Sequence, residues 1–228
     1  MNSRYDATKL QTFVDDPPRL HTWDKGASWN QGGFGPLQLR GIAQILDRLP
    51  DDFRVIETGA GNSTLTFLLC GAKSVVAVAP DAALFDRIVQ YAEQHAIDPS
   101  PLKPVVAYSE DALPGLAITA KETNISYDFA LMDGGHGWPT VFVDFCYFMA
   151  MLKPGGYLMV DDIQLFSVNQ LARFLNESHE FSLILDLKKS LIFRKDSKSV
   201  RMTDFGGQPY IKRMTDAERA ASKEFALE

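Results

Sequence analysis

The stretch VIETGAGNSTL, residues 55–65, runs from apolar residues through a glycine-rich turn into small polar residues. Its first part predicts a buried strand, and Gly59 and Gly61 predict a turn whose backbone can approach a ligand. The residues that follow predict a helix whose first amide groups point at that ligand. A tight turn capped by Ser63 or Thr64 also explains such a motif, so its meaning depends on the rest of the chain.

Short apolar runs alternate with amphipathic segments around this stretch. The predicted strands are 53–58, 74–79, 104–109, 127–133 and 156–162, and the predicted helices are 63–71, 82–96, 112–121, 138–153 and 166–178. A further helix that begins at Pro36 and ends near Leu49 leads into them. Alternation of this kind predicts a parallel sheet with helices on both faces.

The predicted core ends differently from the way it begins. Residues 181–189 and 190–195 are two β-like runs with almost nothing between them, too close for a crossover helix. They predict an antiparallel hairpin. The expected fold class is therefore α/β, with a Rossmann-like, doubly wound, mostly parallel seven-stranded sheet that ends in a C-terminal antiparallel hairpin.

We expect one folded domain over residues 36–195, with an extension on either side. Residues 1–35 show no sustained helical or strand period and are interpreted as an N-terminal arm or lid. Residues 196–228 are interpreted as a C-terminal tail that ends in a short helix over 215–228. The aromatic residues of the arm, which either close over a bound ligand or only pack on the sheet, include Trp23, Trp29 and Phe34.

The overall charge favours a small-molecule partner. The chain has 228 residues, a net charge of −6 and a pI near 5.3, whereas binding to nucleic acid or to an anionic membrane needs clustered Lys and Arg. No run approaches the roughly 18 apolar residues that span a bilayer, and the N-terminal residues lack the apolar core of a signal peptide. We therefore expect a cytoplasmic protein, and the sequence does not indicate its oligomeric state.

The two cysteines, Cys70 and Cys146, lie in apolar helical patterns and have no metal-ligand spacing. Both are expected to be buried, reduced thiols.

Several motifs along the chain have to be considered together. Glu57 ends the first predicted strand, the two glycines follow it, Asp133 ends a later strand, and LKPGGYLMVDD occupies residues 152–162 before the hairpin. Over about residues 36–195 the chain resembles the class I S-adenosylmethionine-dependent methyltransferases. Its Glu-x-Gly-x-Gly-x-Ser, Asp-Gly-x-His and Val-Asp-Asp motifs are most similar to the small-molecule O-methyltransferase-like group, methyltransferase family 24, which is related to the cephalosporin hydroxylases.

The resemblance implies a binding site for S-adenosylmethionine around the glycine turn. Glu57 would face the methionine ammonium group of this cofactor, directly or through water. Gly59 and Gly61 would make room for the cofactor, and Ser63 would offer a hydroxyl group at the start of the helix.

The second strand departs from the family pattern. The family usually places an acidic residue there to hold the ribose hydroxyl groups, but this chain has Ala79. Asp81, two residues further on, is the candidate replacement, and backbone groups with water are the alternative. After the third strand, Glu110 is the candidate contact for the adenine ring.

Three carboxylates are expected at the ends of two strands. Asp133 ends the fourth predicted strand, and Asp161 and Asp162 end the fifth. If these strands are neighbours, about 4.8 Å apart, their carboxylates converge and repel one another unless a cation lies between them. Oxygen ligands with room for water suit Mg²⁺, or Ca²⁺ or Mn²⁺, so these three residues are candidate metal ligands. The alternative is that they only cap helices or hold turns.

His136 lies three residues after Asp133, in the motif ALMDGGHGWPTVF at residues 130–142. An imidazole with a pKa near 6.5 suits a general base, so His136 and Asp133 are the candidate catalytic residues. A surface or capping role is the alternative for His136. The histidines at positions 21, 95 and 179 have no such setting.

The predicted function is methyl transfer from S-adenosylmethionine to a small-molecule acceptor, with a hydroxyl oxygen as the methyl acceptor and a divalent metal or His136 assisting its deprotonation. A non-catalytic module that binds S-adenosylmethionine or a nucleotide remains open because of Ala79. A metal-dependent enzyme of another reaction also remains open, since one fold can carry different chemistry. A dinucleotide oxidoreductase is disfavoured, because Thr64 stands where its third glycine is expected.

Overall fold

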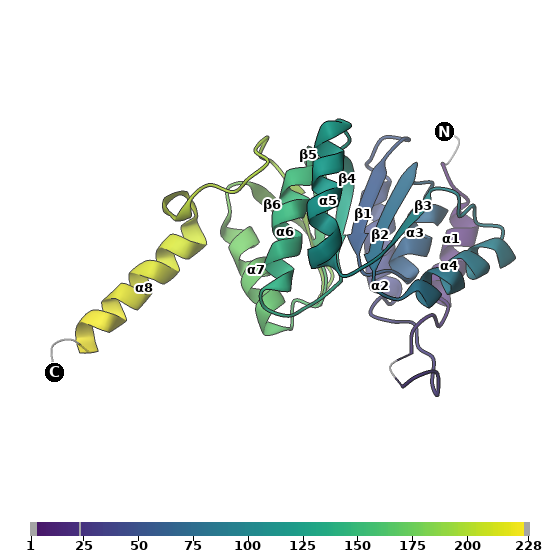
Figure 1. Ribbon diagram of the computed structural model, residues 1–228, viewed down its shortest axis with the longest axis horizontal. Coiled ribbons are helices and arrows are strands. Elements are labelled where there is room, and N and C mark those ends of the chain that lie inside the picture. Colours follow the sequence, from purple (N-terminus) through teal and green to yellow (C-terminus); the bar gives the residue numbers. More distant parts are fainter. Residues whose placement is uncertain (1–3, 23, 226–228) are drawn as a thin grey trace.

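The computed structural model describes residues 4–22 and 24–225, and its centre is a seven-stranded sheet with the strand order β3-β2-β1-β4-β5-β7-β6 (Figure 1). The strands from β1 to β5 pair in parallel, and β7 pairs antiparallel with both β5 and β6. The predicted fold class, with its C-terminal antiparallel hairpin, is confirmed. The strands are β1 Arg54–Thr58, β2 Ser74–Ala79, β3 Leu102–Val106, β4 Tyr127–Met132, β5 Leu152–Val160, β6 Phe181–Asp186 and β7 Leu191–Lys195.

Helices cover both faces of the sheet. The period of two along a strand sends neighbouring side chains to opposite faces, so Val55 packs in one apolar core and Ile56 in the other. The first core holds α1 Ala7–Asp15, α2 Pro36–Leu46, α3 Asn62–Leu69 and α4 Ala82–Gln94. The second core holds α5 Ser109–Glu122, α6 Thr140–Met151 and α7 Phe166–Glu177.

Strand β3 ends earlier in the chain than the sequence predicted. β3 ends at Val106 rather than at residue 109, because Ser109 already begins α5. Helix α5 therefore also starts earlier than the predicted 112–121.

The N-terminal extension contains a helix that the sequence did not predict. Helix α1 begins after Asp6, whose carboxylate accepts hydrogen bonds from the amides of Thr8 and Lys9, and it ends just before Pro17. Its buried residues, at positions 10, 13 and 14, have helical spacing but form one short stripe only. They join the first core, so this part of residues 1–35 is packed rather than an open arm. Trp23, assigned to the same arm, lies outside the described residues.

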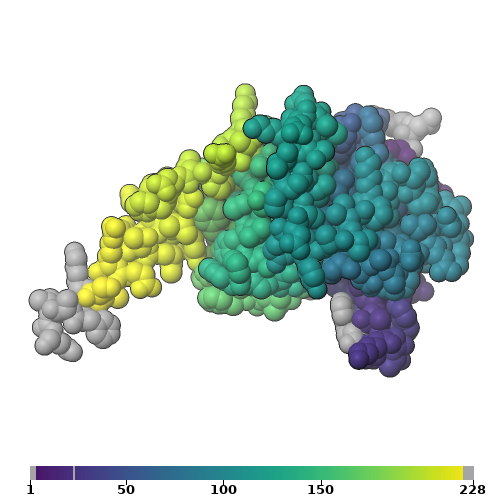
Figure 2. Space-filling view, viewed as in Figure 1, coloured from purple at the N-terminus to yellow at the C-terminus, as the bar shows by residue number. Residues whose placement is uncertain are grey.

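The C-terminal tail contains the short helix η1, Phe205–Gly207, followed by α8, Pro209–Phe225, which projects from the body of the protein (Figures 1 and 2). Helix α8 begins six residues before the predicted residue 215. Pro209 is its first residue, and proline is favoured at the first position of a helix. The Tyr210 hydroxyl donates to Gln170 Oε1 over 2.5 Å, and Arg213 pairs with Glu177 at 2.6 Å. These contacts attach the first turns of α8 to α7. None of the described helices is both long and apolar enough to cross a bilayer.

The two cysteines differ in their surroundings. Cys70 is buried, as predicted, but the prediction for Cys146 is wrong because its side chain is exposed. Helix α6 is apolar on nearly every side, and its buried stripe runs through Phe145, Phe148 and Met149, which leaves Cys146 on the outer face.

Candidate active site

A cavity of about 420 Å³ lies at the carboxyl ends of β1, β2 and β4, where open α/β sheets bind their ligands. Its walls come from the glycine turn, from the loops after β2, β4 and β5, and from the N-terminal segment between residues 21 and 34. The fold thus brings most of the predicted site residues to one place. Those that line the cavity are Gly59, Gly61, Ser63, Asp81, Asp133, His136 and Asp162. Glu57, Glu110 and Asp161 do not line it.

The two glycines of the turn are required by close packing. Gly59 has φ +85°, and a Cβ atom there would lie 2.4 Å from the carbonyl oxygen of Asp133. Gly61 has φ +152°, and a Cβ atom there would lie 2.6 Å from His21 Nε2. The glycines therefore hold the turn against the loop after β4 and against the N-terminal segment, in addition to lining the cavity.

The position of Glu57 differs from the one that the resemblance implied. Its side chain is fully buried beneath the turn, where Ser63 Oγ donates to Oε2 over 2.7 Å and Thr64 Oγ1 donates to Oε1 over 2.5 Å. Burial raises the pKa of Glu57 to about 8, although these hydrogen bonds oppose the change. Glu57 therefore braces the start of α3, and its predicted contact with the cofactor ammonium group, directly or through water, stays a prediction.

The substitution Glu57→Gln tests this role. Because the folded pKa is raised above its usual value of 4.5, the stability that protonated Glu57 contributes is complete below pH 4.5 and is lost as the pH rises through about 8. We expect Glu57→Gln to gain stability relative to the wild type over this interval, on the order of a few kcal/mol, in urea melts at pH 5 and pH 8. Cofactor affinity should stay close to that of the wild type. A loss of affinity of ~10-fold or more would restore Glu57 as a partner of the cofactor ammonium.

The N-terminal segment is tied over the glycine turn. Asn62 Nδ2 donates to the carbonyl oxygens of Pro18 and Gln31, over 3.1 and 2.8 Å. Arg87 Nε donates to the carbonyl oxygen of Leu20 over 2.9 Å, and its guanidinium lies 5.0 Å from the centre of the Trp29 ring. The segment thus forms one wall of the cavity. Its anchors Asn62 and Arg87 were not predicted, because they contact the segment mainly through backbone carbonyl groups that leave no sequence pattern.

Asp81 and Glu110 have different surroundings from each other. Asp81 lies at the edge of the cavity and pairs with Arg87 at 3.0 Å, so its predicted contact with a ribose remains a prediction. Glu110 instead accepts hydrogen bonds from Thr140 Oγ1, over 2.5 Å, and from Ser109 Oγ, over 3.3 Å. Its carboxylate links α5 to α6 outside the cavity wall, and this geometry does not support its predicted contact with adenine.

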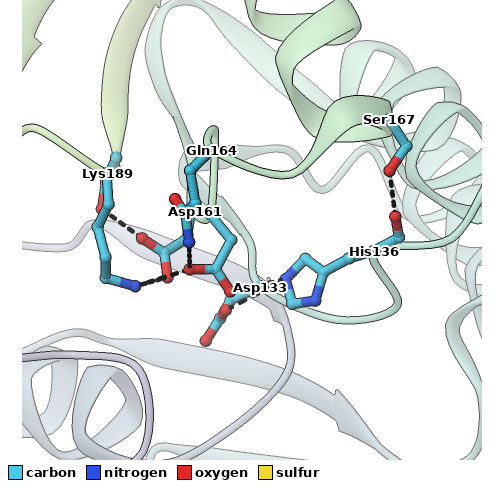
Figure 3. Close-up of polar contacts among 8 residues, drawn as sticks. Asp133, His136, Asp161, Gln164, Ser167 and Lys189 are labelled. Carbon is cyan, nitrogen blue, oxygen red and sulfur yellow. Dashed lines mark hydrogen bonds and ion pairs between the residues drawn. The ribbon is translucent and has the colours of Figure 1, made fainter.

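His136 faces two of the predicted carboxylates, of which Figure 3 labels Asp133. Its Nε2 atom lies 3.7 Å from Asp133 Oδ1 and 3.5 Å from Asp162 Oδ2, and this buried nitrogen has no hydrogen-bond partner among the described residues. Ser167 Oγ donates to the carbonyl oxygen of His136, which fixes the loop after β4. The side chains of Asp133 and His136 are 20% and 31% exposed, and both residues line the cavity.

The carboxylates change the proton affinity of this group. Asp133, followed by Asp162, raises the pKa of His136 against the effect of burial. Burial raises the pKa of Asp133, and the His136 ring opposes that change. The titrations of Asp133 and His136 are therefore linked, and each group affects the proton affinity of the other.

The predicted set of three carboxylate ligands is not assembled. The Asp161 side chain is fully buried, with Ser190 Oγ donating to one of its oxygens and Lys189 Nζ lying 2.6 Å from the other. Lys189 Nζ also lies 3.0 Å from Asp162 Oδ1. Both oxygens of Asp161 are thus engaged, and His136 takes its place in the only cluster of potential ligands found among the described residues, which is Asp133, His136 and Asp162. Lys189 was missed, because nothing in the sequence links the hairpin turn to these carboxylates.

Comparisons with known proteins agree with this geometry. A family model described as a methyltransferase domain matches residues 56–163, and no curated protein has a matching sequence. The solved structures similar to this chain include the O-methyltransferase TomG from Streptomyces achromogenes, in complex with S-adenosylmethionine, with 14% identity and a TM-score of 0.61 over 84% of this chain and 91% of that chain.

Two further solved structures share the fold. The methyltransferase MycE of the mycinamycin pathway, in complex with Mg, S-adenosylhomocysteine and mycinamycin VI, has 14% identity and a TM-score of 0.53 over 78% of this chain and 53% of that chain. An rRNA methylase from Streptococcus thermophilus has 16% identity and a TM-score of 0.51 over 71% of this chain and 95% of that chain. At such identities the likeness is one of fold.

The match to the methyltransferase domain, together with a sheet order and glycine turn that fit this fold, identifies a class I S-adenosylmethionine-dependent methyltransferase. Its methyltransferase domain, which the family model matches over residues 56–163, contains the glycine turn, Asp133, His136 and Asp162. The class that the sequence motifs predicted is thus confirmed, and the finer relation to the cephalosporin hydroxylases stays a prediction.

Proposed function

We propose that this methyltransferase transfers a methyl group to a hydroxyl oxygen of a small molecule, with His136 as the base that removes the hydroxyl proton. The observation that carries the proposal is that His136 lines the same cavity as the glycine turn, while its buried Nε2 atom has no hydrogen-bond partner among the described residues and faces Asp133 and Asp162. An acceptor hydroxyl group in the cavity can donate its hydrogen bond to this nitrogen.

The cavity fits S-adenosylmethionine, which when bound supplies an electrophilic methyl group. Its volume of about 420 Å³ lies in the range of small-molecule sites. Helix α3 begins at the cavity, so its first amide groups are available to a ligand. Asn62, which is 2% exposed, also lines the cavity, and its Oδ1 atom has no hydrogen-bond partner in the described part of the chain. A ligand hydroxyl or amino group would satisfy this acceptor.

The chemistry that the chain's own residues contribute is alignment and proton removal. His136 in its neutral form accepts the acceptor's proton at Nε2, and the carboxylates of Asp133 and Asp162 stabilise the imidazolium that forms. The hydrogen bond from Ser167 to the His136 backbone keeps the ring at the cavity. Alignment of the hydroxyl oxygen with the methyl group then accounts for the rest of the rate increase.

Charge supports a small molecule as the acceptor. The net charge of −6 repels the phosphate backbone of a nucleic acid, and acidic side chains, Asp81, Asp133 and Asp162, line the cavity itself. A compact hydroxylated acceptor that lacks negative charge fits these walls better than RNA.

A divalent metal does not fit the three ligands that the sequence predicted, because both oxygens of Asp161 are already bonded to Ser190 and Lys189. One group of potential ligands remains, made of Asp133, His136 and Asp162. Each residue offers one ligand atom, and these atoms lie within 4.8 Å of one another. Asp162, however, also pairs with Lys189. We therefore propose proton removal by His136 without a metal step.

The function is tested by incubating the protein with methyl-labelled S-adenosylmethionine and a panel of phenols, catechols and aliphatic alcohols, with a bulk RNA sample as a separate acceptor. The proposal predicts label on a small-molecule oxygen. Label on RNA alone would contradict the acceptor class. Cofactor binding without transfer to any acceptor would favour the non-catalytic module.

The substitution Asp133→Asn should change the pH dependence of the reaction. Since the Asp133 carboxylate raises the pKa of His136, its removal should lower that pKa towards 6.5 and move the acidic limb of the pH–rate profile to lower pH. The maximal rate should fall by at least ~10-fold, because the imidazolium loses a stabilising charge. The exposed Asp111 on α5 gives the control Asp111→Asn, which should leave the profile unchanged. An unmoved limb in Asp133→Asn would argue against His136 as the base.

A further inference from the structure

The ammonium group of Lys189 pairs with the two carboxylates that follow β5, Asp161 and Asp162. The Lys189 ammonium lies 2.6 Å from Asp161 Oδ2, a pair that Figure 3 labels, and 3.0 Å from Asp162 Oδ1. Lys189 lies between β6 and β7, in the turn of the hairpin, where its backbone carbonyl accepts a hydrogen bond from the Ile163 amide over 3.0 Å. The hairpin turn and the loop after β5 are thus joined by both backbone and side chain.

Several contacts hold the side chain of Lys189 beside Asp161. Asp161, its first partner, is fully buried and is also held by Ser190. The ring of Phe34, a buried residue of the N-terminal segment, has its centre 5.5 Å from the ammonium. The side chain of Lys189 is only 28% exposed, so this pair is shielded from the solvent that weakens surface ion pairs.

Asp162 connects this lysine to His136. Its backbone has φ +56°, a conformation that is uncommon for a residue other than glycine and that turns its carboxylate out of the strand direction. One of its oxygens accepts from Lys189 and from Gln164, and the other lies 3.5 Å from His136 Nε2. Lys189 therefore restrains the carboxylate that faces the proposed base.

We propose that the Lys189 ammonium is the resident cation of this carboxylate group, in the place where a divalent metal was expected, and that it positions Asp162 against His136. The consequence for catalysis, turnover that needs no metal, rests on the proposed function. The assignment of the cation itself does not, because it concerns the charges and distances around Asp161 and Asp162 only.

The test is a Mn²⁺ titration of the purified full chain, with the free ion followed by electron paramagnetic resonance. The wild type should bind Mn²⁺ weakly. Lys189→Met, which leaves the carboxylates without their ammonium, should bind it at least ~10-fold more tightly, and the added substitution Asp162→Asn should remove this gain. Lys189→Arg keeps the charge and should behave as the wild type. Lys188→Met, at the exposed neighbouring lysine of the same turn, changes the net charge equally and is the matched control.

Two results would overturn the inference. One is tight Mn²⁺ binding by the wild type that Asp162→Asn abolishes, which would assign a metal to Asp133, His136 and Asp162. The other is a folded Lys189→Met protein that binds Mn²⁺ no better than Lys188→Met. If thermal melting shows that Lys189→Met is unfolded, Lys189→Gln, which keeps a donor for Asp161 without the charge, carries the same comparison. None of these Mn²⁺ binding measurements depends on methyl transfer. A failure of the proposed function in the transfer assay is therefore distinguishable from a failure of this inference.

Discussion

Replacement of His136 by alanine should lower the rate of methyl transfer by ~10²- to 10⁴-fold, the usual loss when a general base is removed. The reason lies in the position of its Nε2 atom, which has no hydrogen-bond partner among the described residues and is flanked by Asp133 and Asp162. The affinity for S-adenosylmethionine should stay within ~3-fold of the wild type, because His136 is proposed to act on the acceptor.

The control for this substitution is His95→Ala. His95 follows α4, where its ring stacks on Tyr91 at a centroid distance of 3.9 Å and contacts no residue of the proposed base group. Its removal should leave turnover unchanged. A His136→Ala enzyme with nearly full activity would show that the acceptor loses its proton elsewhere. Rates should be compared across the full pH profile, because Asp133 and Asp162 raise the pKa of an intact His136.

The substitution Gly59→Ala should have the largest effect on the fold of the site. A Cβ atom at this position would lie 2.4 Å from the carbonyl oxygen of Asp133, in a backbone conformation with φ +85°. The strained conformation and the overlap together should cost about 3 kcal/mol of folding free energy. Relief of the overlap requires the glycine turn and the loop after β4 to separate, so the affinity for S-adenosylmethionine should also fall by at least ~10-fold.

Gly115→Ala is the matched control for that change. Gly115 lies inside α5, and a Cβ atom there would meet nothing within 4 Å. Since alanine favours a helix interior over glycine, this variant should be stabilised by roughly 0.5–1 kcal/mol and bind the cofactor normally. Urea unfolding and cofactor titration of both variants measure the two effects. Normal binding by Gly59→Ala would mean that the contact between the turn and Asp133 does not shape the cofactor site.

The arrangement of strands and helices could be predicted because it depends on local periods. Apolar runs such as residues 74–79 alternate with helical stripes such as the one through Leu84, Phe85 and Ile88, and each kind of pattern has one favoured structure. Helix α1 was missed because its apolar stripe covers one turn only. The pattern of α6 predicted the helix but not the side on which Cys146 lies, because nearly all of its residues are apolar.

The location of the site could be predicted, because the ends of the strands determine where its residues lie. The order of β1, β4 and β5 places Gly59, Asp133 and Asp162 at one edge of the sheet. The directions of side chains could not be predicted in the same way. Asp161 and Asp162 are neighbours in the chain, yet one turns into the core and the other towards His136 because of the φ of Asp162.

The other differences come from residues distant in the sequence. Lys189 reaches Asp161 from the hairpin turn, 28 positions further along the chain, and only the antiparallel pairing of β5 with β7 brings the two together. Glu57 was expected to bind the cofactor because a carboxylate suits an ammonium group. Its full burial under two hydroxyl groups shows a structural role that the sequence did not predict.

The most direct test of the central claim is a calorimetric titration of S-adenosylmethionine into the wild-type protein, once with Mg²⁺ and once with a chelator. The account predicts one site with an affinity on the order of 1 µM, unchanged by the chelator and weakened in Gly59→Ala. Absence of binding in both conditions would contradict the assignment of the cavity to this cofactor.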